Sequence, residues 1–187
     1  MLRLKIAQAA SAHGGNIYYS HLDSPIGIIH LAVYDKCICK VSLGFSAASD
    51  FKNYFSFLHA FKLIDSHPST KPFKEMILSY LEKGVPLNDA EVAILRGTEF
   101  QKSVWRAALN IPYGKTRSYG WIAEKIKKPD ASRAVGNALG ENPVPLFIPC
   151  HRVVRSDGAM GGFTGGCNIK ERLLSIEARG IYSDNGI

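Results

Sequence analysis

A short apolar run, residues 144–148, ends at Pro149 and limits the structures that this part of the chain can adopt. Its β-branched and aromatic side chains predict a buried strand. Proline fixes φ and lacks an amide donor, so we expect the strand to end there in a turn. Cys150 would then sit rigidly at a strand-to-turn corner, where its thiol can face a cleft.

The two residues after Cys150 favour a reactive thiol. His151 provides a base that titrates near neutral pH, and Arg152 provides a fixed positive charge that favours a thiolate. A buried structural cysteine is the alternative, and for an isolated cysteine it is the commoner case. Successive residues of an extended chain point to opposite faces, so His151 reaches Cys150 only through a turn or a bridging water.

The net charge of +7 is concentrated in the second half of the 187 residues. Up to Leu95 there are nine Lys and Arg against eight Asp and Glu, a balance of +1; from Arg96 there are fourteen against eight, a balance of +6. A basic half beside a nearly neutral half indicates a polyanion, of which nucleic acid is the commonest. A merely soluble basic surface is the alternative.

The sequence indicates an intracellular protein, cytoplasmic or, in a eukaryote, nuclear. It contains no apolar run long enough to span a membrane and no signal-peptide core near Arg3 and Lys5. Cys37 and Cys39 would lie on one face of a strand, where we expect packing rather than metal binding or a disulfide.

The first half predicts an α+β support domain that ends near Leu95. Residues up to about Gly15 show no periodicity and are expected to form a loose arm. Three strands are predicted at 17–19, 27–34 and 37–43, and a helix at 72–83 that Gly84 stops. The pattern at 50–61 does not decide between helix and strand. No constellation of catalytic residues occurs here.

The second half predicts short helices with clear end signals. Residues 98–101 form a capping box that opens a helix. Ser118 is predicted to cap a second helix, 119–126, and Asp130 a third, 131–139. The last two have the dimensions of a helix-turn-helix, although many helical proteins contain such a pair by chance.

The third of these helices has few side chains that read bases. Arg133 is the one long cation among small residues, whereas major-groove reading needs several Arg, Asn or Gln. Small residues permit close approach to a narrow groove, with Arg133 as the inserted group. A tightly packed internal helix is the alternative.

Beyond the Pro-Cys-His-Arg corner, residues 156–166 contain five glycines and predict a loop that closes on a ligand or exposes backbone amides to it. A final helix then carries Glu177, which can orient His151 as the acid of a triad orients imidazole. A solvated helix carboxylate is the alternative.

Together these residues resemble the DNA repair alkyltransferases that act on 6-O-alkylguanine, the methylated-DNA–protein-cysteine methyltransferases. The resemblance runs almost unbroken from Gly97 to Glu177 and is faint in the first half, mainly at 23–27. The matching segments are 97–101 with Val104 and Trp105, 111–114, Ser118 with Tyr119, 133–136, Asn142 with Pro143, and 149–153, followed by Gly165, Gly166, Lys170 and Glu177.

The resemblance implies an α+β fold in two domains. A ribonuclease-H-like N-terminal domain, with a three-stranded antiparallel sheet and helices, would occupy residues 1–95. A mostly helical domain with a DNA-binding helix-turn-helix and the active site would occupy residues 96–187.

The resemblance also implies catalytic roles. Cys150 is the alkyl acceptor, His151 deprotonates it through a water, and Glu177 holds His151. Asn142 stabilises the turn between helix and strand, and Tyr119 assists base flipping at the phosphate and reaches the base.

Contacts with DNA and with the flipped base are implied as well. Arg133 enters the minor groove and fills the gap left by the base. The implied DNA-binding set is Ser132, Arg133, Ala134, Gly136 and Tyr119, and the base pocket is Tyr119, Val153, Phe163 and Thr164. The carbonyls of Cys150 and Val153 would accept from the guanine amino group.

The implied function is direct, irreversible transfer of one alkyl group from 6-O-alkylguanine, and from 4-O-alkylthymine, in double-stranded DNA to Cys150. It requires base flipping, because the reacting atom is inaccessible in the stack. We expect no cofactor, no metal, no membrane partner and a monomer. Phe163 and Thr164 stand where relatives often carry tyrosine and serine, which leaves the backbone contact with the base intact.

Three other functions compete with this one. A lesion-sensing binder without chemistry would lack Cys150, which is present with His151 and Glu177. A cysteine hydrolase would need an oxyanion-hole pattern, which is not evident. A transcriptional regulator is disfavoured by the sparse reading helix and the absence of an obvious dimerisation element.

Overall fold

The computed structural model describes residues 3–5, 14–44, 47–56, 58–65, 67–88 and 90–184. The strands are β1 (Arg3–Lys5), β2 (Gly15–Leu22), β3 (Ile29–Tyr34), β4 (Cys37–Ser42), β5 (Phe61–Asp65), β6 (Glu91–Ala93), β7 (Arg117–Ser118) and β8 (Val153–Val154). The helices are α1 (Ala47–Ser56), α2 (His67–Lys83), α3 (Glu99–Leu109), α4 (Tyr119–Lys125), α5 (Ser132–Gly140) and α6 (Cys167–Asp184), with 3-10 turns η1 (Pro129–Ala131) and η2 (Cys150–Arg152).

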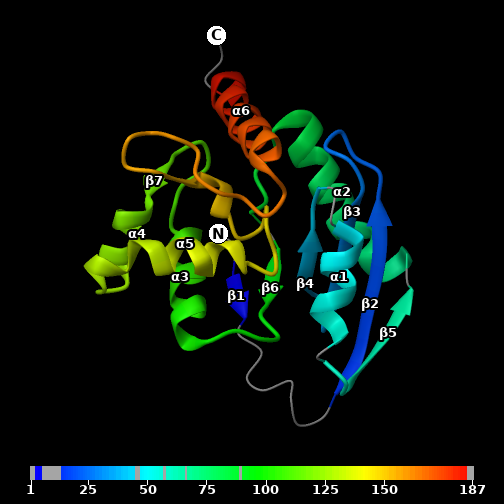
Figure 1. Ribbon diagram of the computed structural model, residues 1–187. Coiled ribbons are helices and arrows are strands. Elements are labelled where there is room, and N and C mark those ends of the chain that lie inside the picture. The colour runs from blue at the N-terminus through cyan, green and yellow to red at the C-terminus, as the bar shows by residue number, and fades with distance from the viewer. Residues whose placement is uncertain are drawn as a thin grey trace.

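The predicted α+β class is confirmed, and the antiparallel trio of the prediction is extended to a six-stranded sheet. Strands β2, β3 and β4 pair antiparallel in sequence order. Parallel strands then extend both edges, in the order β1-β6-β4-β3-β2-β5 (Figure 1). The three added strands come from segments of five residues or fewer, too short to show a clear alternation.

The prediction of a loose arm before Gly15 is wrong for Arg3–Lys5, which form β1 beside β6. Residues 6–13 of that arm lie outside the described residues. The undecided segment 50–61 contains the end of α1 and the start of β5. Phe51, Tyr54 and Phe55 give α1 one buried face through their i, i+3, i+4 spacing.

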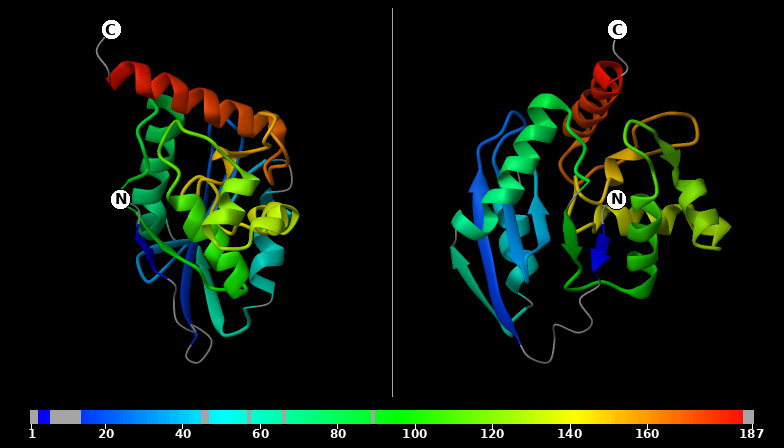
Figure 2. Two further views of the ribbon diagram at one scale, coloured as in Figure 1. Left: turned by 90° about the vertical axis from the view of Figure 1, so that its left-hand side faces the viewer. Right: turned by 180° about the vertical axis from the view of Figure 1, so that it is seen from behind.

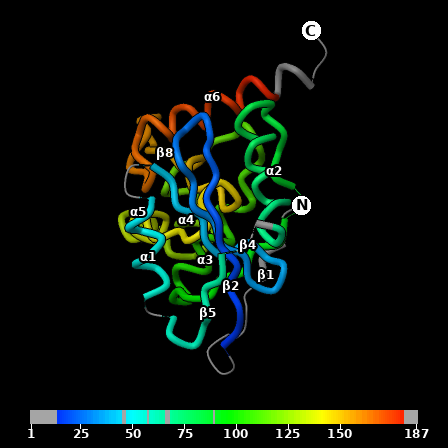
Figure 3. Tube along the Cα trace, turned by 90° about the vertical axis from the view of Figure 1, so that its right-hand side faces the viewer, coloured from blue at the N-terminus to red at the C-terminus, as the bar shows by residue number. Residues whose placement is uncertain are grey.

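Alternate residues of the strands face two different cores, as a pleated strand requires. Leu31 and Val33 face α2 and the helices of the second half, whereas Ala32 faces α1. Figures 1 and 2 show α1 and α2 covering opposite faces of the sheet. Figure 3 views the sheet from its β2–β5 edge, with α1 on one side, α2 on the other and the helices of the second half behind.

Helix α2 begins at His67, earlier than predicted, and contains Pro72. Gly84 ends it as expected, with φ +70° and its amide bonded to the carbonyl of Tyr80 at 3.0 Å. A Cβ added at Gly84 would lie 3.3 Å from the Cα of Gly180 in α6. The two helices therefore cross in close contact, which brings α2 to the second half of the chain.

The helices of the second half form largely where the sequence placed them. Both parts of the Thr98–Gln101 capping box are present, and Ser118 caps α4 by accepting from the amide of Trp121 at 3.1 Å. The prediction that Asp130 caps the next helix is wrong, because Pro129–Ala131 form a 3-10 turn and Ala131 precedes α5 without a side-chain cap.

Candidate active site and DNA-binding face

The apolar run before Cys150 is buried but is not a regular strand, so the predicted strand at 144–148 is wrong. The run makes a single isolated bridge, between Pro145 and Ile148, and Leu146 has φ +75°. Prolines at 143, 145 and 149 remove three amide donors, so a continuous ladder cannot form. Cys150 instead begins the 3-10 turn η2, and the predicted turn is confirmed.

The side chain of Asn142 holds this irregular segment together. Its Nδ2 donates to the carbonyl of Ile148 at 2.9 Å, and its Oδ1 accepts from the amide of Val144 at 3.0 Å. The same Nδ2 lies 3.1 Å from Sγ of Cys150 and donates to it. Asn142 therefore fixes the turn and places a hydrogen-bond donor on the sulfur.

The thiol of Cys150 is almost fully buried, with 5% of the residue exposed. Burial raises its pKa to about 11, while the hydrogen bond from Asn142 and the positive charge of Lys170 act in the opposite direction. The ammonium of Lys170 is itself buried and donates to the carbonyls of Val153 and Met160. The thiol is therefore protonated at neutral pH unless a base removes its proton.

His151 and Glu177 lie in contact and are both fully buried. Nε2 of His151 is 2.8 Å from Oε1 of Glu177, across 26 residues of sequence. Burial lowers the pKa of His151, although the hydrogen bond and charge of Glu177 oppose that shift. The imidazole is therefore neutral at pH 7 and able to accept a proton.

Arg152 does not serve Cys150 as the sequence suggested. Its guanidinium bonds both carboxylate oxygens of Glu177 at 2.9–3.1 Å and also the carbonyl of Ile111 at 2.8 Å. Burial acts to raise the pKa of Glu177, but His151 and Arg152 outweigh it and hold that pKa at about 2. Arg152 therefore keeps the carboxylate ionised, and this charge-neutral cluster is closed by the amide of Gly114 at 2.9 Å.

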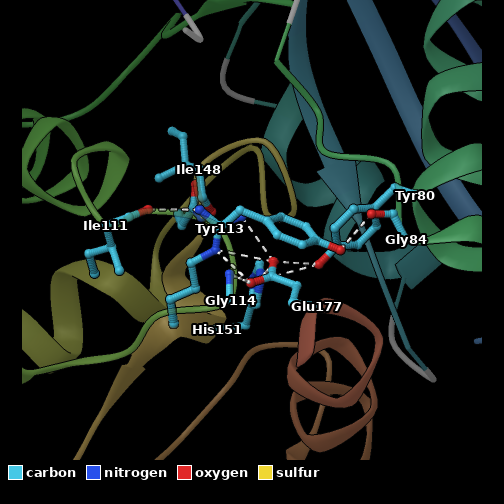
Figure 4. Close-up of polar contacts among 10 residues, drawn as sticks. Tyr80, Gly84, Ile111, Tyr113, Gly114, Ile148, His151 and Glu177 are labelled. Carbon is cyan, nitrogen blue, oxygen red and sulfur yellow. Dashed lines mark hydrogen bonds and ion pairs between the residues drawn. The ribbon is translucent and has the colours of Figure 1, made fainter. Parts of the chain in front are cut away.

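One residue of this cluster, Tyr80 of α2, was not predicted from the sequence. Its hydroxyl donates to Oε1 of Glu177 at 2.8 Å and lies 3.3 Å from Nε2 of His151 (Figure 4). The residue stands 97 positions before Glu177 and reads as one more apolar member of a helix face. No local signal separates such a tyrosine from a core residue.

A pocket of about 400 Å³ opens beside the thiol. Tyr119 enters it from the start of α4, between Gly136 of α5 and Gly161 of the glycine-rich loop. A Cβ at Gly161 would lie 2.5 Å from the Tyr119 hydroxyl, so only glycine permits this approach. The pocket is lined by Tyr119, Gly136, Asn137, Leu139, Gly140, Cys150, Gly162, Phe163 and Thr164.

Most of the predicted pocket residues meet there, and Val153 does not. Phe163 and Thr164 line the pocket, with the Thr164 hydroxyl bonded to the carbonyl of Gly140 at 2.8 Å. Val153 is fully buried, and its carbonyl accepts from Lys170 at 2.6 Å. A second lone pair of that carbonyl remains for the predicted base contact.

The predicted DNA-binding residues share one surface next to this pocket. Arg133 and Ala134 are exposed on α5, and Ser132 and Gly136 are half-buried. A shallow hollow of about 630 Å³ joins Arg133, Ser132 and Gly136 to Tyr119 and to Arg155 beyond the active-site turn. The exposed helix face thus continues into the pocket that holds the thiol.

The described residues contain neither a membrane-spanning helix nor a cluster of metal-binding side chains. No helix among them combines the length and apolar character needed to cross a bilayer. Nor do three His, Cys, Asp or Glu side chains gather there in a group that could hold a metal ion.

Comparison with known proteins adds a family profile and full-length relatives. Residues 99–179 match the profile described as the DNA-binding domain of 6-O-methylguanine DNA methyltransferase. A methylated-DNA–protein-cysteine methyltransferase of Mycobacterium tuberculosis is 37% identical over 164 residues, 86% of this chain and 92% of the relative. One from Methanosarcina barkeri is 39% identical over 172 residues, covering 88% and 99%.

Solved structures agree with these relatives over both halves of the chain. A crystal structure of Mycobacterium tuberculosis OGT in complex with DNA aligns with a TM-score of 0.71 at 36% identity, covering 87% of this chain and 93% of that one. The structure of O6-methylguanine methyltransferase from the same organism aligns at 0.73 and 35%, with the same coverage.

Proposed function

This chain belongs to the methylated-DNA–protein-cysteine methyltransferases, and we propose that it repairs DNA by moving the alkyl group of 6-O-alkylguanine onto its own Cys150. The observation that carries the assignment is the setting of that thiol. It lines a base-sized pocket, accepts a hydrogen bond from Asn142 and directly precedes His151, which contacts Glu177. We extend the substrate to 4-O-alkylthymine, which carries the same kind of alkylated oxygen.

The reaction is a displacement at the alkyl carbon. The thiol gives its proton to Nδ1 of His151 through a water, and Glu177 stabilises the imidazolium that forms. The S–C bond then forms as the C–O bond breaks, and guanine leaves as a neutral base after taking up a proton. The thioether has no good leaving group, so each molecule reacts once and needs no cofactor.

The exposed face of α5 is the surface that we assign to DNA. Helices α4 and α5 serve as the helix-turn-helix, with small residues Ser132, Ala134 and Gly136 against the minor groove. Arg133 enters the groove and replaces the flipped base. Phosphates supply most of the affinity, because the second half carries the excess of positive charge.

The flipped base occupies the pocket beside Cys150. Tyr119 packs on it, Phe163 closes the opposite wall, and the amide of Thr164 points at the alkylated oxygen. Flipping costs a few kcal/mol, which the contacts of α5 offset.

We also propose roles for the two halves of the chain and a cellular location. Residues 96–187 bind DNA and carry out the transfer. Residues 1–95 support that half through contacts in the core that both halves share. The protein acts as a monomer wherever the genome is, in the cytoplasm or, in a eukaryote, in the nucleus.

The decisive experiment mixes the protein with a duplex that contains one 6-O-methylguanine and weighs the intact protein. We expect one added methyl group per molecule, mapped to Cys150, and no further repair when lesion is in excess. Cys150→Ser should remove transfer, whereas Cys167→Ser, at the exposed cysteine, should not. Sustained turnover, or methyl found on another cysteine, would contradict the proposal.

The role of α5 is tested with Arg133→Ala and, as a matched loss of one charge on the same surface, Arg155→Ala. Arg133→Ala should slow repair of the duplex far more than reaction with the free alkylated base. Arg155→Ala should weaken duplex binding modestly and reduce its salt dependence. Equal losses on duplex and free base in Arg133→Ala would remove the insertion role.

A further inference from the structure

Tyr80 is the only contribution of the sheet half to the polar cluster around His151, among the residues that the structure describes. The residue is 1% exposed, and its hydroxyl is 2.8 Å from Oε1 of Glu177 and 3.3 Å from Nε2 of His151. Figure 4 shows the phenol reaching from α2 to the carboxylate on α6. This hydroxyl therefore contacts both members of the His151–Glu177 pair, which core packing alone does not require.

Close packing fixes the phenol in this position. Helix α2 ends at Lys83, about one turn after Tyr80, and the carbonyl of the next residue, Gly84, accepts from the Tyr113 hydroxyl at 2.6 Å. A Cβ at Gly180 would lie 2.8 Å from that hydroxyl and 3.0 Å from the carbonyl of Gly84. The contact between α2 and α6 therefore leaves Tyr80 little freedom to move away from Glu177.

The hydrogen bonds among Tyr80, Glu177 and His151 define the tautomer of His151. A phenol has one proton, and the shorter contact shows that Tyr80 gives it to Oε1 of Glu177. Nε2 lies 2.8 Å from the same oxygen, so it must carry a hydrogen as well. Nδ1 then holds the lone pair, and it is buried without a partner among the described residues.

We propose that Tyr80 is a positioning residue for alkyl transfer: by donating to Glu177 it orients the carboxylate and keeps Nδ1 of His151 unprotonated and ready to accept the proton of Cys150. The inference rests on the proposed function, because it assigns His151 the role of base. It makes the sheet half part of the reaction machinery, through one hydroxyl.

The effect on His151 has a definite sign. The charged or titratable groups around the imidazole are Glu177 and Lys170 of α6, Arg152 and Cys150 of its own turn, and Tyr80 of α2. Among them Glu177 raises the pKa of His151. The Tyr80 proton partly neutralises that carboxylate, and burial raises the pKa of Tyr80 well above its ordinary value, so the phenol stays protonated. Removing it exposes His151 to more negative charge and raises the pKa of His151.

The test is Tyr80→Phe, which keeps the ring and removes the hydroxyl. Single-turnover transfer from a 6-O-methylguanine duplex, and from the free alkylated base, is measured against pH. The acid side of the rate profile should move up by about half to one pH unit on both substrates. Titration of the His151 imidazole by NMR should show the same upward displacement.

Tyr113→Phe is the matched control, because it removes a neighbouring, partly buried hydroxyl that donates to the backbone carbonyl of Gly84. It should lower the melting temperature without moving the pH profile. In a Glu177→Gln background, Tyr80→Phe should add almost no further loss, since its effect passes through that carboxylate.

The outcomes separate this inference from the proposed function. If wild-type protein transfers no alkyl group to Cys150, the proposed function fails and this role fails with it. If transfer occurs and Tyr80→Phe leaves the pH profile and the His151 titration where they were, or if Tyr113→Phe moves them equally, only the role of Tyr80 is overturned.

Discussion

Cys39 in the sheet and Cys150 in the η2 turn are both buried cysteines, and burial raises the pKa of both thiols. The two thiols differ in the hydrogen bonds that their sulfur atoms make. Cys39 donates to the carbonyl of Ala32 at 3.3 Å, within an apolar cluster that contains Phe51 and Phe55. Cys150 instead accepts from the Asn142 amide and lies within the field of the Lys170 ammonium.

Burial alone therefore does not decide whether a thiol is reactive. A backbone hydrogen bond and the charge of Lys40 favour the Cys39 thiolate as well, but the carbonyl to which this thiol donates would repel it. A sulfur that accepts a hydrogen bond beside a buried cation is prepared for the thiolate form, and a neutral imidazole nearby can take the proton. We infer that these groups, rather than exposure, separate the reactive cysteine from the inert one.

The largest effect should come from breaking the imidazole–carboxylate pair. Glu177→Gln should slow transfer by about 10³-fold, since general base catalysis contributes on this scale, while lesion binding is nearly retained. The measurement is single-turnover transfer, with folded protein quantified in parallel because Arg152 loses its partner. Asp50→Asn is the control: it breaks the 2.6 Å Lys40–Asp50 pair of the sheet half and should leave transfer unchanged. A similar loss in both variants would show that stability, not the relay, is measured.

The second effect is on the pH dependence of the free energy of unfolding, to which the Glu177–His151 cluster contributes in acid and the surroundings of Cys39 do not. The pKa of Glu177 falls from an ordinary 4.5 to about 2 in the folded protein, so its stabilisation is present above pH 4.5 and is lost as pH falls towards 2. This loss is on the order of 3 kcal/mol. His151, whose pKa burial lowers, adds a further loss below pH 6.5 because the unfolded chain takes up the proton first.

Urea unfolding at pH 7, 4 and 3 measures this dependence. Glu177→Gln should flatten the part below pH 4.5, and Cys39 variants should not change it. Above pH 9 the sign reverses and both regions contribute, because the unfolded chain ionises Cys39 and Cys150 before the folded protein does. An acid limb that persists in Glu177→Gln would assign it to other carboxylates.

The third effect concerns the donor on the sulfur. Asn142→Asp keeps the oxygen that accepts from Val144 but replaces the amide beside Cys150 with a carboxylate oxygen. The pKa of Cys150 should rise above 11, towards the condition of Cys39, and transfer at pH 7.5 should fall about 10- to 100-fold. Raising the pH should recover part of the rate, which misfolding would not allow. Asn110→Asp, the same change at the exposed end of α3, is the control.

Elements with local signals were predicted from sequence. The Thr98–Gln101 capping box and the Ser118 cap need only residues three apart, and both helices begin where those residues predict. The break between the predicted strands 27–34 and 37–43 likewise appears as a turn, with Asp35 and Lys36 at positive φ. The meeting of His151 with Glu177 was predicted because a known family pattern joins them, which spacing alone does not.

Features made by distant segments were not predicted. Strands β1 and β6 are three residues long and exist through pairing with each other, so neither has a pattern of its own. The irregular run before Cys150 depends on the Asn142 side chain in place of a strand partner. Tyr80 reaches the site only because α2 and α6 cross at glycines, and Arg152 is drawn to Glu177 rather than to the neighbouring thiol.

The smallest effect is expected at Cys39, the cysteine that we regard as inert. Cys39→Ser places a hydroxyl where the thiol donates to Ala32, so the hydrogen bond is kept and only the polarity of the group increases. The cost should be about 1 kcal/mol of unfolding free energy, measured by urea denaturation. Transfer to Cys150 should stay at the wild-type rate and stoichiometry. A serine at Cys39 that slowed transfer without a matching loss of folded protein would connect the sheet core to the reaction, and the contrast between the two thiols would then fail.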